Sequence, residues 1–283
     1  MKGVTALQQN NNKMELKFDN NRRKASICPC GKSNKDGKFA PFKGFQNKGY
    51  CHACAETFYP EDDAVNFITF EPQPKEEIRL IDKEIFTQSL DDYDKNSFTA
   101  FLIKRFNIRK AEKMINTYHL GTSGEDVIFW QLDQDYNIRT GKVINYDRET
   151  GKRQGLPSWV HNYLNQTYKQ CLFGLHLIGQ NNKPIAIVES EKTAVIMSWI
   201  NPHFNWLATG GISNLSKSRL EVIKGRELTL FPDQGAYELW DNKAKEIGLN
   251  YKISKECEYW YDDNLIDAKD DIADYYLKNY KSL

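Results

Sequence analysis

The chain has 283 residues, of which 27% are charged and 40% apolar, and a formal net charge of +1 at pH 7. This length accommodates two or three compact units, and the composition is that of an ordinary water-soluble protein. No apolar run approaches the roughly 20 residues of a membrane helix, and the polar N-terminus lacks the apolar core of a secretory signal. We therefore expect a cytoplasmic protein without a membrane partner.

Charge is distributed unevenly over the first third of the chain. Residues 1–60 hold eleven lysines and arginines against four acidic residues, whereas residues 61–95 hold four against eleven. The polar, Asn-rich residues 1–25 are predicted to be flexible. Residues 61–90, which include Pro72 and Pro74, are predicted to form an extended linker.

Two close cysteine pairs precede this linker. Their 20-residue separation predicts a zinc ribbon over residues 26–60, because each pair supplies two thiolates to one tetrahedral ion. A reducing compartment also favours structural zinc over disulfides. The four predicted zinc ligands are Cys28, Cys30, Cys51 and Cys54.

The segment between the cysteine pairs mixes lysines with aromatic residues. Such a mixture holds phosphates and stacks on unpaired bases, so Lys38 and Lys43 are expected to contact nucleic acid. The other two cysteines, Cys171 and Cys257, stand alone and are predicted to be buried thiols without chemistry.

A basic α+β unit is predicted over residues 91–178. Apolar residues recur with helical spacing over 96–116, and apolar runs at 127–130 and 138–144 read as strands. Alternating apolar and charged positions favour an antiparallel sheet with one solvent-exposed cationic face. The cations expected to hold nucleic acid or nucleotide in this unit are Arg105, Arg139, Lys142, Arg148 and Lys152.

Residues 179–283 change to a strand–helix rhythm. Strands are predicted at 185–188, 206–209, 228–231 and 251–253, with helices at 191–200, 214–223, 236–247 and 267–280. This alternation is typical of a parallel sheet covered by helices, so the fold class is α/β.

Acidic residues follow the strands of this predicted sheet. Glu189 comes directly after residues 185–188, and Asp233 follows 228–231. Ligands of parallel sheets bind at the carboxyl ends of the strands, where carboxylates hold Mg²⁺ together with substrate phosphates. Asp262 and Asp267 come from a later acidic stretch and are expected to assist. The alternative is structural: Glu189 caps a helix and Asp233 belongs to a turn.

A family resemblance enters at these residues. Val188-Glu189-Ser190-Glu191-Lys192 resembles the first motif of the Toprim domain, and Leu230-Phe231-Pro232-Asp233 resembles the approach to its Asp-x-Asp motif. Thr209-Gly210-Gly211 resembles the Gly-containing turn after the second strand, and residues 267–274 resemble the late acidic stretch. With the ribbon and the basic unit in front, the order resembles that of DnaG-type primases and of primase-like proteins of phages and mobile elements.

The resemblance implies synthesis of short primers on single-stranded DNA from nucleoside triphosphates with Mg²⁺ or Mn²⁺. It implies Glu189 as acid/base or metal-adjacent carboxylate, Asp233 as metal ligand, Lys192 among the nucleotide contacts, and a separate replicative helicase as partner. The chain departs from the family pattern at Ser190, where Gly is usual, and at Gly235, where the second Asp is missing. Two alternatives remain: a weak or inactive Toprim DNA-binding protein of a mobile element, and a Toprim nuclease.

Overall fold

The computed structural model describes residues 16–54, 56–60, 79–164, 168–211 and 214–279. The chain divides into two compact units, Met1–Lys75 and Glu76–Leu283. Most of the predicted linker and the first 15 residues of the predicted flexible segment lie outside the described residues. Residues 16–25, in contrast, belong to the N-terminal unit: the Phe18 ring stacks on Phe42 at 5.0 Å, and Ala25 is buried.

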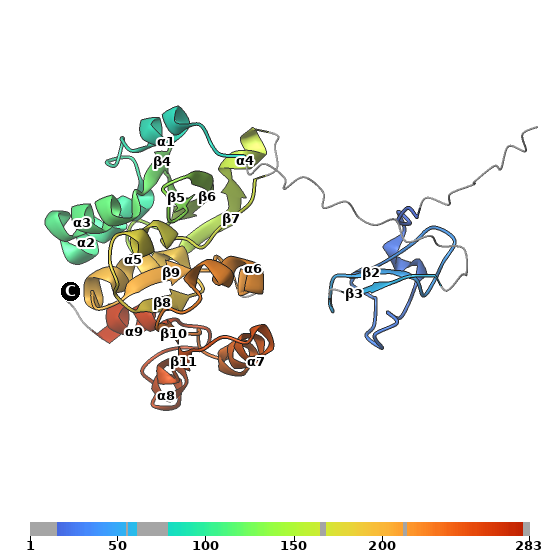
Figure 1. Ribbon diagram of the computed structural model, residues 1–283. Helices are drawn as coiled ribbons and strands as arrows, with labels where there is room; N and C mark the ends of the chain where they lie inside the picture. The colour runs from blue at the N-terminus through green and yellow to red at the C-terminus, as the bar shows by residue number, and fades with distance from the viewer. Residues whose placement is uncertain (1–15, 55, 61–78, 165–167, 212–213, 280–283) are drawn as a thin grey trace, which may run out of the picture. The chain divides into compact units, whose positions relative to one another are not determined.

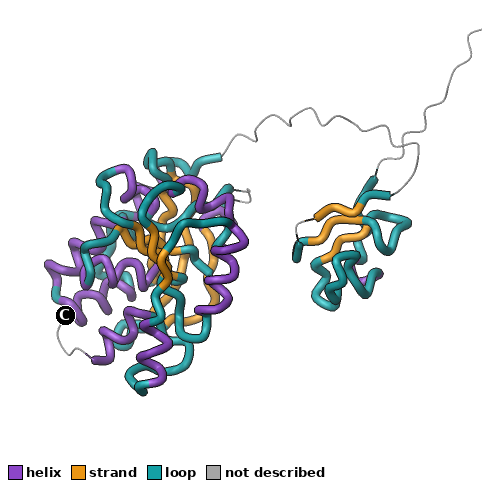
Figure 2. The backbone as a smooth tube through the Cα atoms, turned by 60° about the horizontal axis from the view of Figure 1, so that its bottom comes forward, coloured by secondary structure: helices purple, strands orange, loops and turns teal. Residues whose placement is uncertain are grey.

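The N-terminal unit is built on a three-stranded antiparallel sheet (Figure 2). A short 3-10 helix, η1 (Arg22–Lys24), precedes strands β1 (Phe39–Pro41), β2 (Gly49–Cys51) and β3 (Glu56–Phe58), which lie in that order. The strands β1 and β2 approach so closely at Gly49 that a Cβ there would lie 2.2 Å from the Ala40 carbonyl oxygen. Glycine is therefore required at this position.

Asn34 organises the loops of this small unit from inside. The side chain is 2% exposed, and its Oδ1 accepts a hydrogen bond from the Phe39 backbone N–H at 2.6 Å. Its Nδ2 lies within hydrogen-bond distance of the backbone carbonyls of Arg22, Ala25 and Phe39. One buried side-chain amide thus provides hydrogen-bond partners for backbone groups of Arg22, Ala25 and Phe39 that do not bond to a neighbouring strand.

The larger unit begins with helices α1 (Lys83–Ser89), α2 (Ser97–Phe106) and α3 (Ile108–Tyr118). Helix α1 lies within the segment expected to be a linker. The single helix expected over 96–116 is two helices, because Asn107 adopts a left-handed φ of 76° between them. Its side chain accepts a hydrogen bond from the Lys110 N–H and caps α3.

An antiparallel sheet follows, with its strands side by side in chain order: β4 (Gly121–Ser123), β5 (Asp126–Leu132), β6 (Ile138–Tyr146) and β7 (Arg153–Trp159). The expected solvent-exposed cationic face is wrong for β5 and β6. Val127 and Phe129 enter one apolar cluster, whereas Ile128 and Trp130 enter another, so both faces are covered. Helix α4 (Val160–Tyr163) and 3-10 helix η2 (Leu175–Gly179) continue the chain.

The last part is a parallel sheet covered by helices, as expected (Figure 1). Its strand order is β11-β10-β8-β9, and all three pairings are parallel. The strands are β8 (Ile185–Val188), β9 (Asn205–Ala208), β10 (Leu228–Leu230) and β11 (Lys252–Ile253). The helical segments are α5 (Glu191–Ile200), α6 (Lys217–Leu220), η4 (Glu221–Ile223), α7 (Tyr237–Ile247), α8 (Glu256–Asp262) and α9 (Ile272–Asn279).

The two faces of this sheet enter different cores. Ala186 and Val188 join a cluster that extends from Phe98 on α2 to Ala273 on α9, and Ile185 and Ile187 join a second cluster. The predicted regions 91–178 and 179–283 therefore share one hydrophobic core. Among the described residues, no helix combines the length and hydropathy of a membrane span.

Candidate functional site

The four predicted zinc ligands converge in the N-terminal unit. The Sγ atoms of Cys28, Cys30, Cys51 and Cys54 all lie within 4.8 Å of one another. Sulfurs around a tetrahedral zinc ion, with bonds of about 2.3 Å, are roughly 3.8 Å apart. The arrangement therefore suits a structural zinc ion. The remaining cysteines, Cys171 and Cys257, are buried free thiols, as expected.

Backbone geometry prepares the cysteine cluster for a cation. Gly31, with a φ of 86°, closes a tight turn in which its N–H donates to the Cys28 carbonyl at 2.8 Å. Burial raises the pKa of the Cys51 thiol, but hydrogen bonds from Cys28 and from the N–H groups of Cys54 and Ala53 outweigh it and lower that pKa to about 7. Burial and the side-chain hydrogen bonds to Cys30 and Cys51 raise the pKa of Cys28 to about 12, so the cluster favours thiolate at Cys51 rather than at Cys28.

In the larger unit, the carboxyl ends of the parallel strands form a polar edge. Glu189 follows β8, the Thr209-Gly210-Gly211 turn follows β9, and Asp233 follows β10 after Phe231 and Pro232. Because β8 pairs with both β9 and β10, these segments meet at one end of the sheet. We call this end the carboxyl edge.

Asp233 is the most unusual group at the carboxyl edge. Its Oδ1 is enclosed and has no hydrogen-bond partner among the described residues. Burial, together with the nearby Asp271, Glu189 and Asp274, raises the pKa of Asp233 to about 8 against the opposing effect of Lys192. A carboxyl held in this way near neutrality is a feature of functional sites.

Two acids of the predicted late acidic stretch, which were not among the predicted metal ligands, complete the edge. Asp271 is 7% exposed and stands before α9, where its Oδ1 accepts from the N–H groups of Ala273 and Asp274. The Asp274 carboxylate accepts in return from the Asp271 N–H at 3.1 Å, so the two residues form a reciprocal helix cap. Burial and Asp274 raise the pKa of Asp271.

Lys192 is the counter-ion of this acidic group. It lies in the first turn of α5, and its Nζ is 3.3 Å from the Asp274 carboxylate. Although burial lowers the pKa of Lys192, Asp271 and Asp274 more than offset that effect and raise it. One fixed ammonium therefore faces several carboxylates, which leaves the edge able to accept a further cation.

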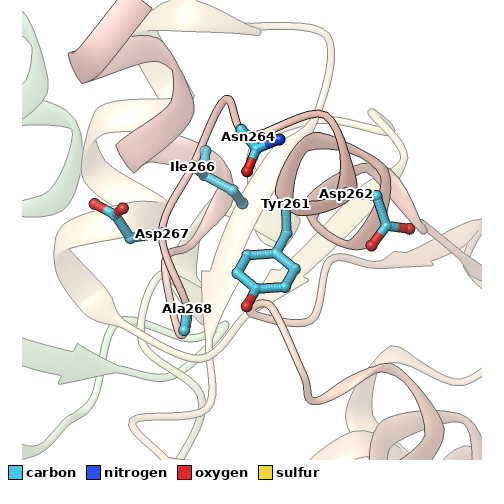
Figure 3. A pocket seen from close by; sticks show the side chains of 6 residues that line it. All are labelled: Tyr261, Asp262, Asn264, Ile266, Asp267 and Ala268. Atoms are coloured by element: carbon cyan, nitrogen blue, oxygen red, sulfur yellow. The ribbon is translucent and has the colours of Figure 1, made fainter.

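Asp262 and Asp267 do not belong to the buried part of this group. Both are exposed, and Figure 3 shows their carboxylates pointing to opposite sides of the loop that follows α8. They line an open cavity of about 490 Å³ together with Tyr261 and Asn264. Asp267 pairs instead with Lys278, which lowers the pKa of Asp267.

The residues after Asp233 form a turn. Gly235 has a left-handed φ of 81°, and its N–H donates to Oε1 of Glu258 on α8 at 2.9 Å. Gln234 accepts from the Lys269 N–H at 3.0 Å and donates its own N–H to the Asp270 carbonyl at 2.9 Å. The Asp233 turn is thereby tied to the loop that carries Asp271.

Lys142 reaches the carboxyl edge from the antiparallel sheet. Its Nζ lies 2.9 Å from the Glu191 carboxylate, and the two side chains are 10% and 2% exposed. It also donates to the Gly210 carbonyl at 3.3 Å. A Cβ at Gly210 would lie 2.8 Å from Glu191 Oε1, so the turn packs directly against this ion pair.

The other predicted cations differ in how exposed they are and in which groups they already bond. Arg139 is buried and pairs with Asp133 at 3.1 Å, and Arg105 donates to the Leu277 carbonyl. Arg148 bonds the Lys95 carbonyl at the surface, and Lys152 is exposed. In the ribbon, Lys38 pairs with Asp36 and Lys43 is exposed.

The acids of the carboxyl edge are spread more widely than the sulfurs. Within the described ranges, the four cysteines are the one group of three or more potential metal ligands gathered within 4.8 Å. Mg²⁺ in phosphate-handling sites typically takes one or two carboxylates and obtains its other ligands from water and substrate. The edge is therefore a candidate metal centre that substrate would complete.

Comparison with known proteins adds the following. A family model described as a domain of unknown function, DUF6371, matches residues 96–234. No curated protein matches the chain. The chain is similar to the primase fragment of the bacteriophage T7 primase-helicase protein, at 15% identity and a TM-score of 0.42, over 85% of this chain and 88% of that one. It is similar to a DNA primase domain from Pseudomonas aeruginosa, at 13% identity and a TM-score of 0.32, over 62% and 64%.

Breaking the buried Lys142–Glu191 pair should destabilise the larger unit strongly. We expect Lys142→Met and Glu191→Gln each to cost about 3–5 kcal/mol, because each leaves one buried charge unpaired, and the double variant to cost less than their sum. Urea denaturation measures this. The exposed Lys104–Glu149 pair is the control, and its removal should cost under about 1 kcal/mol. Strict additivity at 142 and 191 would contradict the pairing.

Asp233 should make stability depend on pH. Its folded pKa of about 8 lies above the ordinary value of 3.8, so the folded state holds the proton more tightly and stability falls as pH rises from 4 to 8. Asp233→Asn should remove this loss and stabilise the protein by about 2 kcal/mol or more at pH 8 without added divalent ions, with little effect at pH 4. Denaturation curves of both proteins across this range, with Asp262→Asn as control, provide the measurement. An equal difference at both ends would count against a raised pKa.

Proposed function

We propose that the chain is a primase-like Toprim protein that synthesises short primers on single-stranded DNA with Mg²⁺ or Mn²⁺. The observation that carries the proposal is the carboxyl edge: Glu189 and Asp233 follow paired parallel strands, and the enclosed Asp233 Oδ1 has no partner among the described residues. Such an oxygen is stabilised by a proton or a cation. A cation site at this edge of a parallel sheet suits phosphate substrates.

In the proposed reaction, the 3′ oxygen of one nucleotide bonds to the α-phosphorus of the next and pyrophosphate leaves. A divalent ion held by Asp233, with Asp271 or Asp274 nearby, would offset charge on the triphosphate. Glu189, which follows the neighbouring strand β8, would receive the proton that the 3′ hydroxyl loses. Lys192 keeps the acids together between turnovers, and the exposed Lys152 is a candidate contact for the triphosphate or template.

The zinc ribbon has a separate proposed role. Its lysines and aromatic residues would hold single-stranded template, with the exposed Lys43 as a phosphate contact. A separate helicase would then supply the unwound DNA. In this proposal the ribbon positions template and takes no part in the chemistry.

A second candidate, a weak or inactive DNA-binding protein, is favoured by one observation. Glu258 on α8 accepts a hydrogen bond from the Gly235 N–H. This bond occupies the turn where the family's second Asp would stand. A Cβ at Gly235 meets no atom within 4 Å, but the left-handed φ strains any side chain there. Asp tolerates this region better than most residues. Gly235→Asp should therefore fold and raise activity if a missing carboxylate limits the enzyme.

A primer-synthesis assay on single-stranded DNA with labelled nucleotides tests the proposal. With Mg²⁺ or Mn²⁺ the wild type should make short products, and Asp233→Asn and Glu189→Gln should each reduce the rate at least about 100-fold, as for lost charge stabilisation. A comparison of the rates of Asp271→Asn and Asp262→Asn shows whether primer synthesis depends on the buried acid or on the exposed one. Wild-type protein that makes no primer, or strand cleavage instead of synthesis, would overturn the assignment in favour of a binding protein or a nuclease.

Purified protein should contain about one zinc ion per chain, bound by the four cysteine thiolates. Cys51→Ser should lose it and unfold the N-terminal unit, because binding of structural zinc contributes on the order of 10 kcal/mol to folding at pH 7. Elemental analysis checks the metal, and limited proteolysis checks the unit. Cys171→Ser is the matched control and should keep its zinc; full zinc content in Cys51→Ser would refute the site.

A further inference from the structure

A second pocket lies at the opposite end of the parallel sheet from the acids. Lys183 precedes β8 and Asn205 begins β9, so this pocket opens at the amino ends of the strands. Its volume is about 420 Å³, and its walls come from α3, the end of α5 and the segments before the two strands. We call it the amino-edge pocket.

The charged residues that line the amino-edge pocket are all basic among the described residues. Its lining includes the exposed Lys113 and Lys183, and none of the described residues that line it is acidic. Lys183 Nζ also donates to the Pro202 carbonyl at 2.8 Å, which fixes its position at the rim. A ligand of this pocket therefore carries negative charge.

The same pocket offers a flat apolar surface beside these cations. The half-buried Trp199 lines it, and the Nζ atoms of Lys110 and Lys113 lie 5.4 and 5.5 Å from the Trp199 ring centre. Phe204 adds a second aromatic wall. An indole with ammonium groups over its ring suits an unpaired base that is followed by a phosphate, because the base takes the ring face and the phosphate takes the ammonium groups.

Polar side chains at the pocket provide neutral hydrogen-bonding groups. Asn205 Nδ2 donates to Asn181 Oδ1 at 2.8 Å, and both residues line the pocket. Because Asn205 is only 4% exposed and Asn181 Oδ1 also accepts from the Lys183 N–H, the Asn181 amide N–H₂ is the group that this pair offers to a nucleobase edge.

The cations continue beyond the pocket along α3. Lys110, Lys113 and Thr117 are spaced three and four residues apart, so they lie on one side of the helix. Arg109 is exposed one residue before Lys110, and the single acid of α3, Glu112, is also exposed. A row of cations extending from a base-sized pocket suits an extended polyanion better than an isolated nucleotide.

We infer that the amino-edge pocket binds one nucleotide of a single-stranded nucleic acid, with the base against Trp199 and the backbone on Lys113, Lys183 and the α3 cations. This site is remote from the carboxyl edge along the strands and requires neither metal nor catalysis. It extends the proposed function by giving the chain a second contact with its nucleic acid.

The test uses the full chain, labelled oligothymidylate and no added divalent ion. Oligothymidylate should quench tryptophan fluorescence, and Trp199→Phe should remove most of that change while anisotropy shows that binding persists. Trp199→Ala should weaken binding about tenfold, as expected for loss of a stacked base, and Trp199→Phe should restore part of it. Unchanged quenching in Trp199→Phe would overturn the inference.

Lysine variants test the phosphate contacts. Lys113→Ala with Lys183→Ala should weaken binding and make the salt slope less negative by about 1.4, or roughly 0.7 for each lost contact. Lys224→Ala, which removes an exposed cation elsewhere, should leave the slope unchanged. No difference between these variants would overturn the phosphate contacts.

Competition experiments identify which kind of ligand binds the amino-edge pocket. Saturation of the Trp199 signal by thymidine triphosphate alone at the same concentration would reassign the pocket to a free nucleotide. Equal competition by polyglutamate would reassign it to acidic peptides. Asp233→Asn should keep the Trp199 signal whether or not primer synthesis is observed, so failure of one proposal is distinguishable from failure of the other.

Discussion

The buried ion pair between Lys142 and Glu191 connects the two sheets of the larger unit. Lys142 projects from the antiparallel sheet, whereas Glu191 begins the helix that follows β8 of the parallel sheet. Because a buried charge without its partner is costly, the two sheets are restrained in one arrangement at this point. The Gly210 turn packs on the pair and accepts a hydrogen bond from it. The geometry of the carboxyl edge therefore depends on a residue outside the parallel sheet.

The carboxyl edge combines groups that oppose stability. Asp233 and Asp271 are both carboxyls whose pKa is raised mainly by burial, and Lys192 only partly balances them. The reciprocal cap of α9 and the hydrogen bonds of Gln234 hold these acids in place despite their mutual repulsion. Unfavourable charges kept together at a strand end are typical of functional sites, where stability is not maximal.

The bounds of helices and strands were predicted most accurately where a short run of residues is wholly apolar. β8 and α5 have the predicted bounds, because Ile185–Val188 is uninterrupted and Ser190 stands before the helix. The break at Asn107 was not predicted, since helical periodicity continues across it and a left-handed residue leaves the apolar spacing intact. The cysteine spacing predicted the cluster because ligand geometry is local.

The candidate site was predictable only in part. Glu189 and Asp233 follow strands, so the topology places them, whereas the choice among the acids of 262–274 depends on burial that periodicity does not show. Besides its place in the late acidic stretch, Asp271 had a local signal, the Asp-x-x-Asp spacing at the start of α9 that forms the reciprocal cap. Arg139 and Lys142 were expected to be exposed, because alternation alone does not reveal that apolar clusters cover both faces of β5 and β6.

The shared core has a consequence for how the chain folds as it is synthesised. Phe98 on α2 and Ala273 on α9 belong to the same buried cluster, although 175 residues separate them in the sequence. That cluster is complete only when α9 has left the ribosome, so the apolar surfaces of α2, α3 and β5 remain without their final partners until residues 272–279 have been synthesised. The cysteine unit, whose described residues end at position 60, has all its ligands long before that and needs only its metal. The cysteine unit is thus expected to fold before the larger unit, with nascent larger-unit intermediates as the species that depend on chaperones.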